Sequence, residues 1–158
     1  SMGVEKIILN TSSVNNTALI DEIAIKHGSQ SIIHSIDLLK INNSYKVRFD
    51  NNKVSCNYEL SEWIGILNEK PIGEILINSI DNDGSLMGYD INLIKKIEKK
   101  IKFPILILGG CGNWNHILEL FNNTNISAAC TQNIYHFSNE SIMSLKKFLK
   151  INGHEIRN

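Results

Sequence analysis

The sequence predicts an α/β fold built on a mostly parallel sheet of about five βα units. Short runs rich in β-branched residues alternate with longer runs of helical period, which is typical of successive βα units. The run from Ile105 to Leu108 is wholly apolar, as expected for a parallel strand covered on both faces. Polar and glycine residues collect just after the strands, at the edge where parallel α/β proteins form their sites.

Each expected strand is a short apolar run, and each expected helix has apolar residues three and four positions apart. The strands are expected at 6–10, 31–36, 74–80, 105–108 and 126–130, and the helices at 19–27, 60–69, 92–100, 116–121 and 141–151. Residues 45–56 alternate around a polar turn and predict a small hairpin inserted after the second strand. Periodicity alone does not decide between an open doubly wound sheet and part of a larger barrel.

Composition limits the class of protein. The 158 residues are 42% hydrophobic, so we expect one domain over residues 3–158, with Ser1 and Met2 typical of an expression scar. Sixteen basic residues balance sixteen acidic ones, so no net charge favours nucleic acid or an anionic membrane as a partner. No apolar run approaches the ~20 residues of a membrane span. Three widely spaced cysteines indicate reduced thiols, so we expect a cytoplasmic protein.

Asp37 is the first candidate for catalysis. It follows the second expected strand, so its carboxylate is expected at the rim of the sheet, where it could transfer protons. An aspartate that caps the next segment is an equally good interpretation. Period-two alternation places Asp37 and Ser35 on one face and His34 on the other, so His34 is expected to pack beneath a helix. The five histidines show no metal-ligand spacing, and we expect neither a metal nor a cofactor.

Two glycine turns are candidates for phosphate binding. Gly109, Gly110 and Gly112 lie between an apolar strand and a helix, and backbone amides without side chains suit a phosphate at a helix N-terminus. A tight strand-to-helix turn is the alternative interpretation. Asp83 and Gly84 follow the third strand, although an Asp-Gly pair is also a common turn by itself.

The run from Gly73 to Asp90 resembles the most distinctive segment of a known family, the cyclase subunits of imidazole glycerol phosphate synthase. Further matching segments follow in that family's order: Leu9-Asn10-Thr11, Gly28-Ser29-Gln30, Ser35-Ile36-Asp37, Gly109 to Gly112, and Tyr135-His136-Phe137. The resemblance extends from Gly3 to Arg157. It implies a TIM-type (β/α)8-barrel, of which this chain would form a partial barrel that begins at about the fourth strand.

The resemblance also implies an activity. The family is a lyase of histidine biosynthesis that takes ammonia from a glutaminase partner and converts a phosphorylated ribotide into imidazole glycerol phosphate and aminoimidazole carboxamide ribotide. Asp37 would be one of two acid–base aspartates, the other lying on a strand outside this chain. The residues implied in phosphate binding are Asn10, Thr11, Asp83, Gly84, Gly109, Gly110 and Asn133. Lys6 and Glu74 would belong to an ammonia gate, or form an ordinary exposed ion pair of about 0 to 1 kcal/mol.

Three residues depart from the family's pattern, because Asn78, Leu108 and Asn133 replace small hydroxyl residues that are usual in the histidine enzyme. Asn78 with Leu108 is similar to a branch of amidotransferase-associated proteins of surface-glycan biosynthesis, which makes lipopolysaccharide or flagellar sugars. The stretch from Tyr135 to Arg157 is more similar to the histidine enzyme. A third hypothesis is a catalytically silent half-barrel that self-associates through open sheet edges, since proteins rarely leave such edges unpaired.

Overall fold

A computed structural model describes residues 3–49, 54–131, 134–137 and 141–157, with only the backbone described at 54–57, 136 and 137. Five strands lie side by side in chain order and pair in parallel: β1 (Ile7–Leu9), β2 (Ile32–Ile41), β5 (Glu74–Ser79), β6 (Ile105–Leu108) and β7 (Ala128–Cys130). A helix follows each of them along the chain. The predicted succession of five βα units and the TIM-type topology are confirmed.

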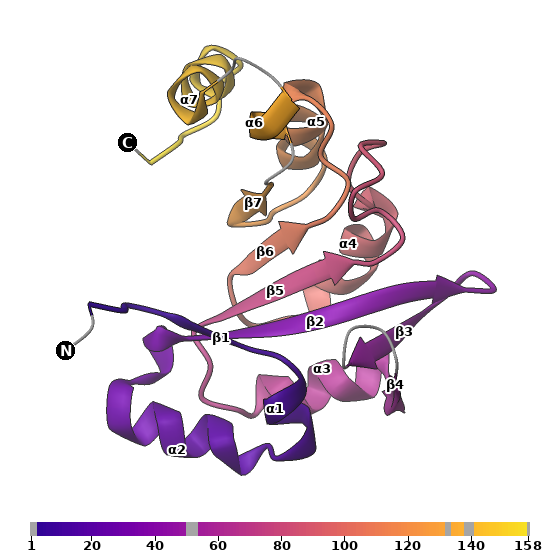
Figure 1. The fold of residues 1–158 in the computed structure, drawn as a ribbon, viewed down its shortest axis with the longest axis vertical. Coiled ribbons are helices and arrows are strands. Elements are labelled where there is room, and N and C mark those ends of the chain that lie inside the picture. Colours follow the sequence, from indigo (N-terminus) through magenta and orange to yellow (C-terminus); the bar gives the residue numbers. More distant parts are fainter. Residues whose placement is uncertain (1–2, 50–53, 132–133, 138–140, 158) are drawn as a thin grey trace.

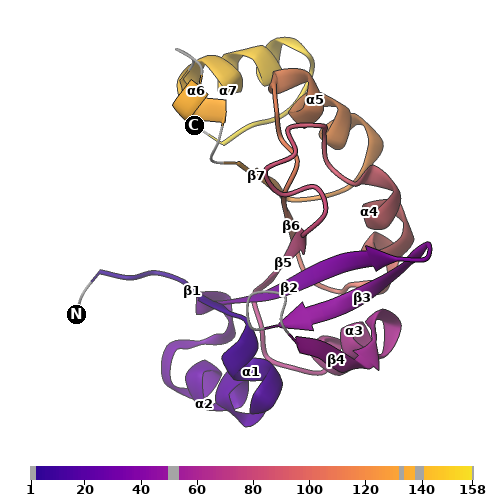
Figure 2. The same ribbon diagram turned by 45° about the vertical axis from the view of Figure 1, so that its right-hand side comes forward.

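The helices form the second layer of the fold. They are α1 (Thr11–Asn15), α2 (Ala18–His27), α3 (Leu60–Asn68), α4 (Ile91–Ile97), α5 (Trp114–Asn123), α6 (Ile134–Phe137) and α7 (Ile142–Ile151), with 3-10 turns η1 (Ser29–Ser31) and η2 (Glu98–Lys100). Figure 2 shows the parallel strands along the inner side of an arc, with the longer helices outside it. The sheet does not close on itself within the described residues. Among the described helices, none is long and apolar enough to cross a membrane.

Strand β2 is longer than the sequence predicted, and this moves Asp37. The expected strand ended at residue 36, but β2 continues to Ile41 because its second half pairs with the inserted hairpin, β3 (Ser44–Phe49) and β4 (Val54–Glu59). Figure 1 shows β2 and β3 extending together beyond the rest of the sheet. Asp37 therefore lies within a strand rather than after one. It pairs with Asn78 of β5 on one side and with Arg48 of β3 on the other.

The core lies between the sheet and the outer helices. Ile36 and Leu38 of β2 are 1% exposed and belong to the same buried cluster as Trp63, which is fully buried on α3. The Trp63 ring meets Phe49 of the hairpin edge-on, with ring centroids 6.4 Å apart. Burying each such side chain stabilises the fold by roughly 1.5 to 3 kcal/mol. The predicted apolar faces of α3 and α4 are confirmed, since Trp63, Ile64, Leu67, Leu93, Ile94 and Ile97 are all buried.

His34 packs beneath a helix, as its place in the alternation predicted. Its side chain is fully buried, and its ring lies edge-on to Trp63 with centroids 5.7 Å apart. The Oγ atom of Ser13 on α1 is its hydrogen-bond partner, 3.1 Å from Nε2. Burial penalises the charged imidazolium and lowers the pKa of His34 from 6.5 to about 4. His34 is therefore a neutral core residue at physiological pH.

The lowered pKa of His34 makes the stability of the fold depend on pH. Between about pH 4 and pH 6.5 the unfolded chain binds a proton that the folded chain does not, so the free energy of unfolding falls as pH falls through this range. The contribution is fully present above pH 6.5 and amounts to about 3 kcal/mol across the range. We expect His34→Val to remove this slope in urea unfolding measured at several pH values.

The exposed His27 at the end of α2 provides the matched control. A His27→Gln variant should keep the pH dependence of the parent chain. If the His34→Val variant lost as much stability between pH 6.5 and pH 4 as the parent chain, His34 would not be the source of the slope.

Candidate functional site

The side chain of Asp37 is held between two asparagine amides. Asn10, directly after β1, donates from Nδ2 to Oδ2 of Asp37 at 2.8 Å, and Asn78 of β5 donates from Nδ2 to Oδ1 at 3.1 Å. Each carboxylate oxygen thus has one amide donor from a neighbouring strand. Three consecutive parallel strands converge on this carboxylate, which lies on the opposite face of β2 from the helices. The prediction that Asp37 faces away from His34 is confirmed.

A small cavity lies at the same end of the sheet. It has a volume of about 110 Å³, and its lining residues are Asp83, Gly84, Leu108, Gly109, Gly110, Cys111, Cys130 and Thr131. Four residues of the two predicted glycine turns, Asp83, Gly84, Gly109 and Gly110, are therefore brought together, while Gly112 does not line the cavity. A cavity of this size suits a group as large as a phosphate. The N–H groups of Gly84 and Gly110 have no acceptor within the described part of the chain, so they are available to an anion.

Gly110 is required by a close approach of two loops. Its φ is 105°, and a Cβ atom there would lie 2.0 Å from the carbonyl oxygen of Gly88. The N–H of Gly88 donates to the carbonyl of Gly110 at 2.7 Å, which joins the loop after β5 to the loop after β6. Asn82 strengthens this junction by donating to the carbonyl of Gly88 at 2.8 Å. The turn is therefore held tightly against the loop after β5.

The cavity has a third wall from the end of β7. The hydroxyl of Tyr89 donates to the carbonyl of Cys130 at 3.0 Å and ties this strand to the loop after β5. Burial raises the pKa of the Tyr89 hydroxyl above its usual range, so it remains a donor. Burial also raises the pKa of the Cys130 thiol, which keeps this wall of the cavity uncharged. Sequence reasoning did not identify Tyr89, Cys130 or Thr131 as cavity residues. Cys130 and Thr131 lie at the end of the short strand β7, whose periodic signal is weak, and Tyr89 lies in the loop after β5.

The glycine turn does not present the helix N-terminus that the sequence suggested. Helix α5 begins at Trp114, and its first turn is capped by Asn113, whose Oδ1 accepts from the N–H of His116 at 3.2 Å. The N–H of Gly112 donates to Nδ1 of His116 at 3.1 Å. These donors are engaged within the chain because the helix starts two residues beyond the last glycine. An anion in the cavity would be bound by loop amides.

Two other predicted phosphate contacts are engaged elsewhere. The N–H of Asp83 donates to the carbonyl of Ser79 at 2.9 Å, and the side-chain N–H of Asn10 points to Asp37. Asp83 would therefore offer its carboxylate to a ligand, which suits a hydroxyl group better than a phosphate. Thr11 begins α1 beside Asn10, and a phosphate at this pair stays a prediction. Asn133 lies outside the described residues.

Asn78 links the Asp37 carboxylate to the cavity. Its Nδ2 atom binds Asp37, and its Oδ1 atom lies 3.5 Å from the position that a Cβ on Gly109 would occupy. In the sequence, Asn78 stood out only as a departure from a family pattern. Its role could have been found from register, because Asn78 is the cross-strand neighbour of Asp37 and the two side chains share one face.

Lys6 and Glu74 meet at the opposite end of the sheet. Lys6 precedes β1 and Glu74 begins β5, and the Lys6 Nζ atom lies 2.5 Å from Oε1 of Glu74. The two side chains are 42% and 24% exposed, so the ion pair is partly open to solvent. A charged pair therefore lies at the end of the sheet where the strands begin, which is where the resemblance implies an ammonia gate. Among the described residues, no cluster of three His, Cys, Asp or Glu side chains could hold a metal ion.

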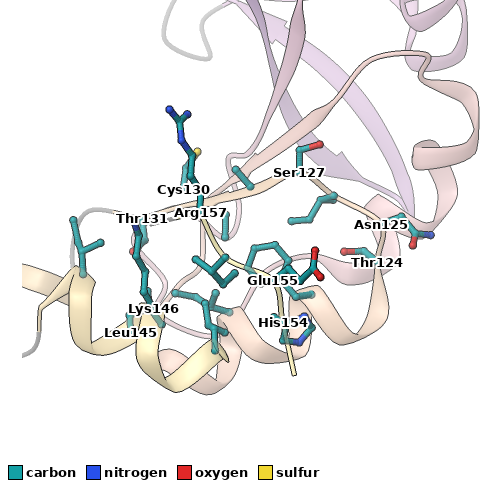
Figure 3. A pocket seen from close by; sticks show the side chains of 18 of the residues that line it. Thr124, Asn125, Ser127, Cys130, Thr131, Leu145, Lys146, His154, Glu155 and Arg157 are labelled. Carbon is teal, nitrogen blue, oxygen red and sulfur yellow. The ribbon is translucent and has the colours of Figure 1, made fainter. Parts of the chain in front are cut away.

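A larger groove runs along the free edge of β7. It has a volume of about 920 Å³, with walls from β7, α5, α7 and the C-terminal segment. Figure 3 shows Cys130 and Thr131 on the strand side and Lys146 and Leu145 on the α7 side. Within the described part of the chain β7 pairs only with β6, so the groove lies beside a strand edge without a partner there, and Asp37 is not among its lining residues.

Comparison with known proteins places the chain in a family. The profile of the family described as "Histidine biosynthesis protein" matches residues 1–140. The chain is 37% identical over 155 residues to the imidazole glycerol phosphate synthase subunit HisF of Chlorobaculum parvum, which covers 98% of this chain and 62% of that relative. The HisF subunit of Bacillus cereus is 34% identical over 156 residues with the same coverage. The chain thus spans 62% of the length of the relatives it matches, and it belongs to the histidine biosynthesis protein family.

Proposed function

We propose that this chain carries the acid–base and phosphate-binding parts of an imidazole glycerol phosphate synthase cyclase site. The observation that carries the proposal is the convergence of Asp37 and the cavity beside Gly110 at one end of the parallel sheet. A phosphorylated ribotide bound there would have its phosphate on the loop amides. Asp37 would then face the part of the ligand that reacts.

Asp37 has the environment of a working proton acceptor. An ionised carboxylate only accepts hydrogen bonds, and both of its partners here, Asn10 and Asn78, donate. The two amides fix the direction of the carboxylate, so its remaining lone pairs point to a defined place. Acid–base catalysis needs such a group within hydrogen-bond distance of the substrate proton.

The residues that line the cavity include no cationic side chain, so an anion would be bound by backbone amides. Unpaired amides of Gly84 and Gly110 attract an anion through their N–H dipoles, as in other backbone anion sites. The Asp83 carboxylate on the cavity wall favours a ligand that brings a hydroxyl group next to its phosphate. Both features suit a sugar phosphate better than a free inorganic anion.

The activity also needs ammonia, which the proposed glutaminase partner would supply. Its relatives are named as subunits of one synthase, which supports a partner protein. Lys6 and Glu74 lie at the end of the sheet opposite Asp37. A partner docked there would release ammonia that reaches Asp37 along the inner face of the strands. Lys6 and Glu74 are therefore proposed as gate residues.

A glycan-pathway activity is the second candidate. The contact between Asn78 and Asp37 favours it, because an amide replaces the hydroxyl that the resemblance leads one to expect at this position. An ammonia-dependent assay with each class of substrate, with the remaining part of the barrel supplied as a second polypeptide, separates the two candidates. Turnover of the ribotide supports the first, and turnover of a sugar precursor alone supports the second.

Self-association is the third candidate, and it is favoured by the outer edge of β1, which has no strand partner among the described residues. Ile8 on this strand is 59% exposed, which is unusual for a strand residue that faces the inside of a barrel. A second copy of the chain would cover this edge and the groove beside β7. Such an assembly would be a catalytically silent scaffold.

Asp37 gives the first test of the cyclase proposal. In the reconstituted ammonia-dependent assay, we expect Asp37→Asn to lower kcat by about 10² to 10⁴, because the isosteric amide cannot accept the substrate proton. Asp21→Asn is the matched control, since Asp21 is an aspartate on α2 that pairs with Lys70 away from the site. Equal rates for Asp37→Asn and the parent chain would exclude Asp37 as the acid–base group.

Gly84 gives a test of the phosphate cavity that avoids a steric clash. Its φ is 75°, and a Cβ there would meet nothing within 4 Å, so Asp or Asn fits in a conformation that both tolerate. We expect Gly84→Asp to weaken binding of ribose 5-phosphate at least about tenfold in calorimetry, because its carboxylate repels the phosphate. Gly84→Asn is the neutral isostere and should bind more tightly than Gly84→Asp; equal affinities would contradict a phosphate in this cavity.

The unpaired edge of β1 is tested by a charge. We expect light scattering to give the chain an apparent mass above the 17.8 kDa of the monomer. The Ile8→Lys variant should have an apparent mass closer to that of the monomer. Ile25→Lys is the control, because Ile25 is 88% exposed on α2, away from the sheet edge. A chain that is monomeric at every concentration would rule out self-association.

A further inference from the structure

A buried polar pair lies directly beneath Asn10. Ser13 on α1 and His34 on β2 are both fully buried, and the Ser13 Oγ atom lies 3.1 Å from Nε2 of His34. The same hydroxyl donates to the backbone carbonyl of Asn10 at 2.8 Å. Fully buried polar side chains cost free energy unless they are hydrogen-bonded, so this pair is a specific feature of the core.

The hydrogen-bond directions within the pair follow from its partners. Because the Ser13 hydroxyl hydrogen is used on the Asn10 carbonyl, its oxygen must accept from His34, which assigns the proton of the neutral ring to Nε2. Nδ1 of His34 is then an acceptor and has no partner among the described residues. The other tautomer would bury an unpaired N–H, which is the costlier arrangement. His34 therefore orients the hydroxyl of Ser13.

The Ser13 hydroxyl is one of two donors that hold the Asn10 backbone. Asn10 lies between β1 and α1 with φ −130° and ψ −111°, neither helical nor extended, and its carbonyl also accepts from the N–H of Ser13 at 3.1 Å. Its side-chain Oδ1 is buried without a partner among the described residues, while its Nδ2 is held by Asp37. The strand register strengthens the arrangement, because Leu9, the residue before Asn10, pairs with His34.

We propose that Ser13 and His34 are positioning residues for Asp37. His34 donates to Ser13, Ser13 donates to the Asn10 backbone, and Asn10 in turn donates to the Asp37 carboxylate. The pair thereby keeps one of the two amide donors on Asp37 in place. The value of this arrangement to the protein rests on the proposed acid–base role of Asp37, but the arrangement itself is measurable without substrate.

A purely structural role for the pair predicts a different outcome from a positioning role. Ser13→Ala leaves His34 with an unpaired buried N–H, so it lowers Tm under both interpretations. The double variant Ser13→Ala/His34→Val removes both polar groups and leaves nothing unpaired within the pair, so Tm should recover most of the loss. The Asn10 carbonyl remains without its hydroxyl donor in both variants. Only the positioning role predicts that Asn10 stays loosened when Tm recovers.

The experiment follows the side-chain amide protons of Asn10 by NMR in the full chain without ligand. Their cross-peak is assigned by its absence in Asn10→Asp. In the parent chain, we expect one proton shifted downfield and slow to exchange, because it is bonded to a carboxylate. Exchange should be roughly tenfold faster in Ser13→Ala and should stay fast in the double variant despite its recovered Tm.

Thr124→Val is the matched control, since the hydroxyl of Thr124 is also buried and bonds a backbone carbonyl, that of Leu120, at 2.7 Å. It should lower Tm and leave the Asn10 protons unchanged. The proposal is overturned if Asn10 exchange is unchanged in Ser13→Ala, or if it returns to the parent value with Tm in the double variant. Loss of activity in Asp37→Asn is measured separately, so either proposal can fail alone.

Discussion

The pairing of β2 with β5 is the constraint on which the rest of the structure depends. Six residues of each strand are in register, from Ile33 opposite Glu74 to Leu38 opposite Ser79. This register places Asp37 beside Asn78, and it places Leu38 opposite Ser79, the last residue of β5. A shift by one residue would turn Asp37 toward the helices and His34 toward the inner face, exchanging a polar site with a core position. The buried faces of both strands therefore determine the register, and the register determines which polar side chains face the site.

The sequence predicted the alternation of strands and helices because parallel strands and amphipathic helices leave strong periodic signals. The two glycine turns were expected after neighbouring strands, and the ends of neighbouring parallel strands share one edge of a sheet. In the structure, Asp83, Gly84, Gly109 and Gly110 line one cavity at that edge. The alternation of side chains along β2 also predicted that Asp37 and His34 lie on opposite faces of the strand.

Other features depend on contacts that a linear pattern does not contain. The length of β2 is set by its antiparallel partner β3, so Asp37 moved from after the strand to within it. The amides on Asp37 depend on a register between segments 27 and 41 residues apart. The pair of Ser13 and His34 was not found because a serine in a helix and a histidine in a strand carry no joint signal. The sequence pattern also did not show that Asn113 caps α5. Because this cap starts the helix at Trp114, the glycine turn does not lie at the helix N-terminus.

The contact between Gly88 and Gly110 has a consequence for how such a site can diversify. Two backbones touch here, and Gly110 has no room for a side chain at the point of contact. The loops after β5 and β6 are therefore tied to each other, so that an insertion in one demands a compensating change in the other. Changes in ligand size within this lineage should therefore accumulate at the flanks of the site and leave its centre unaltered.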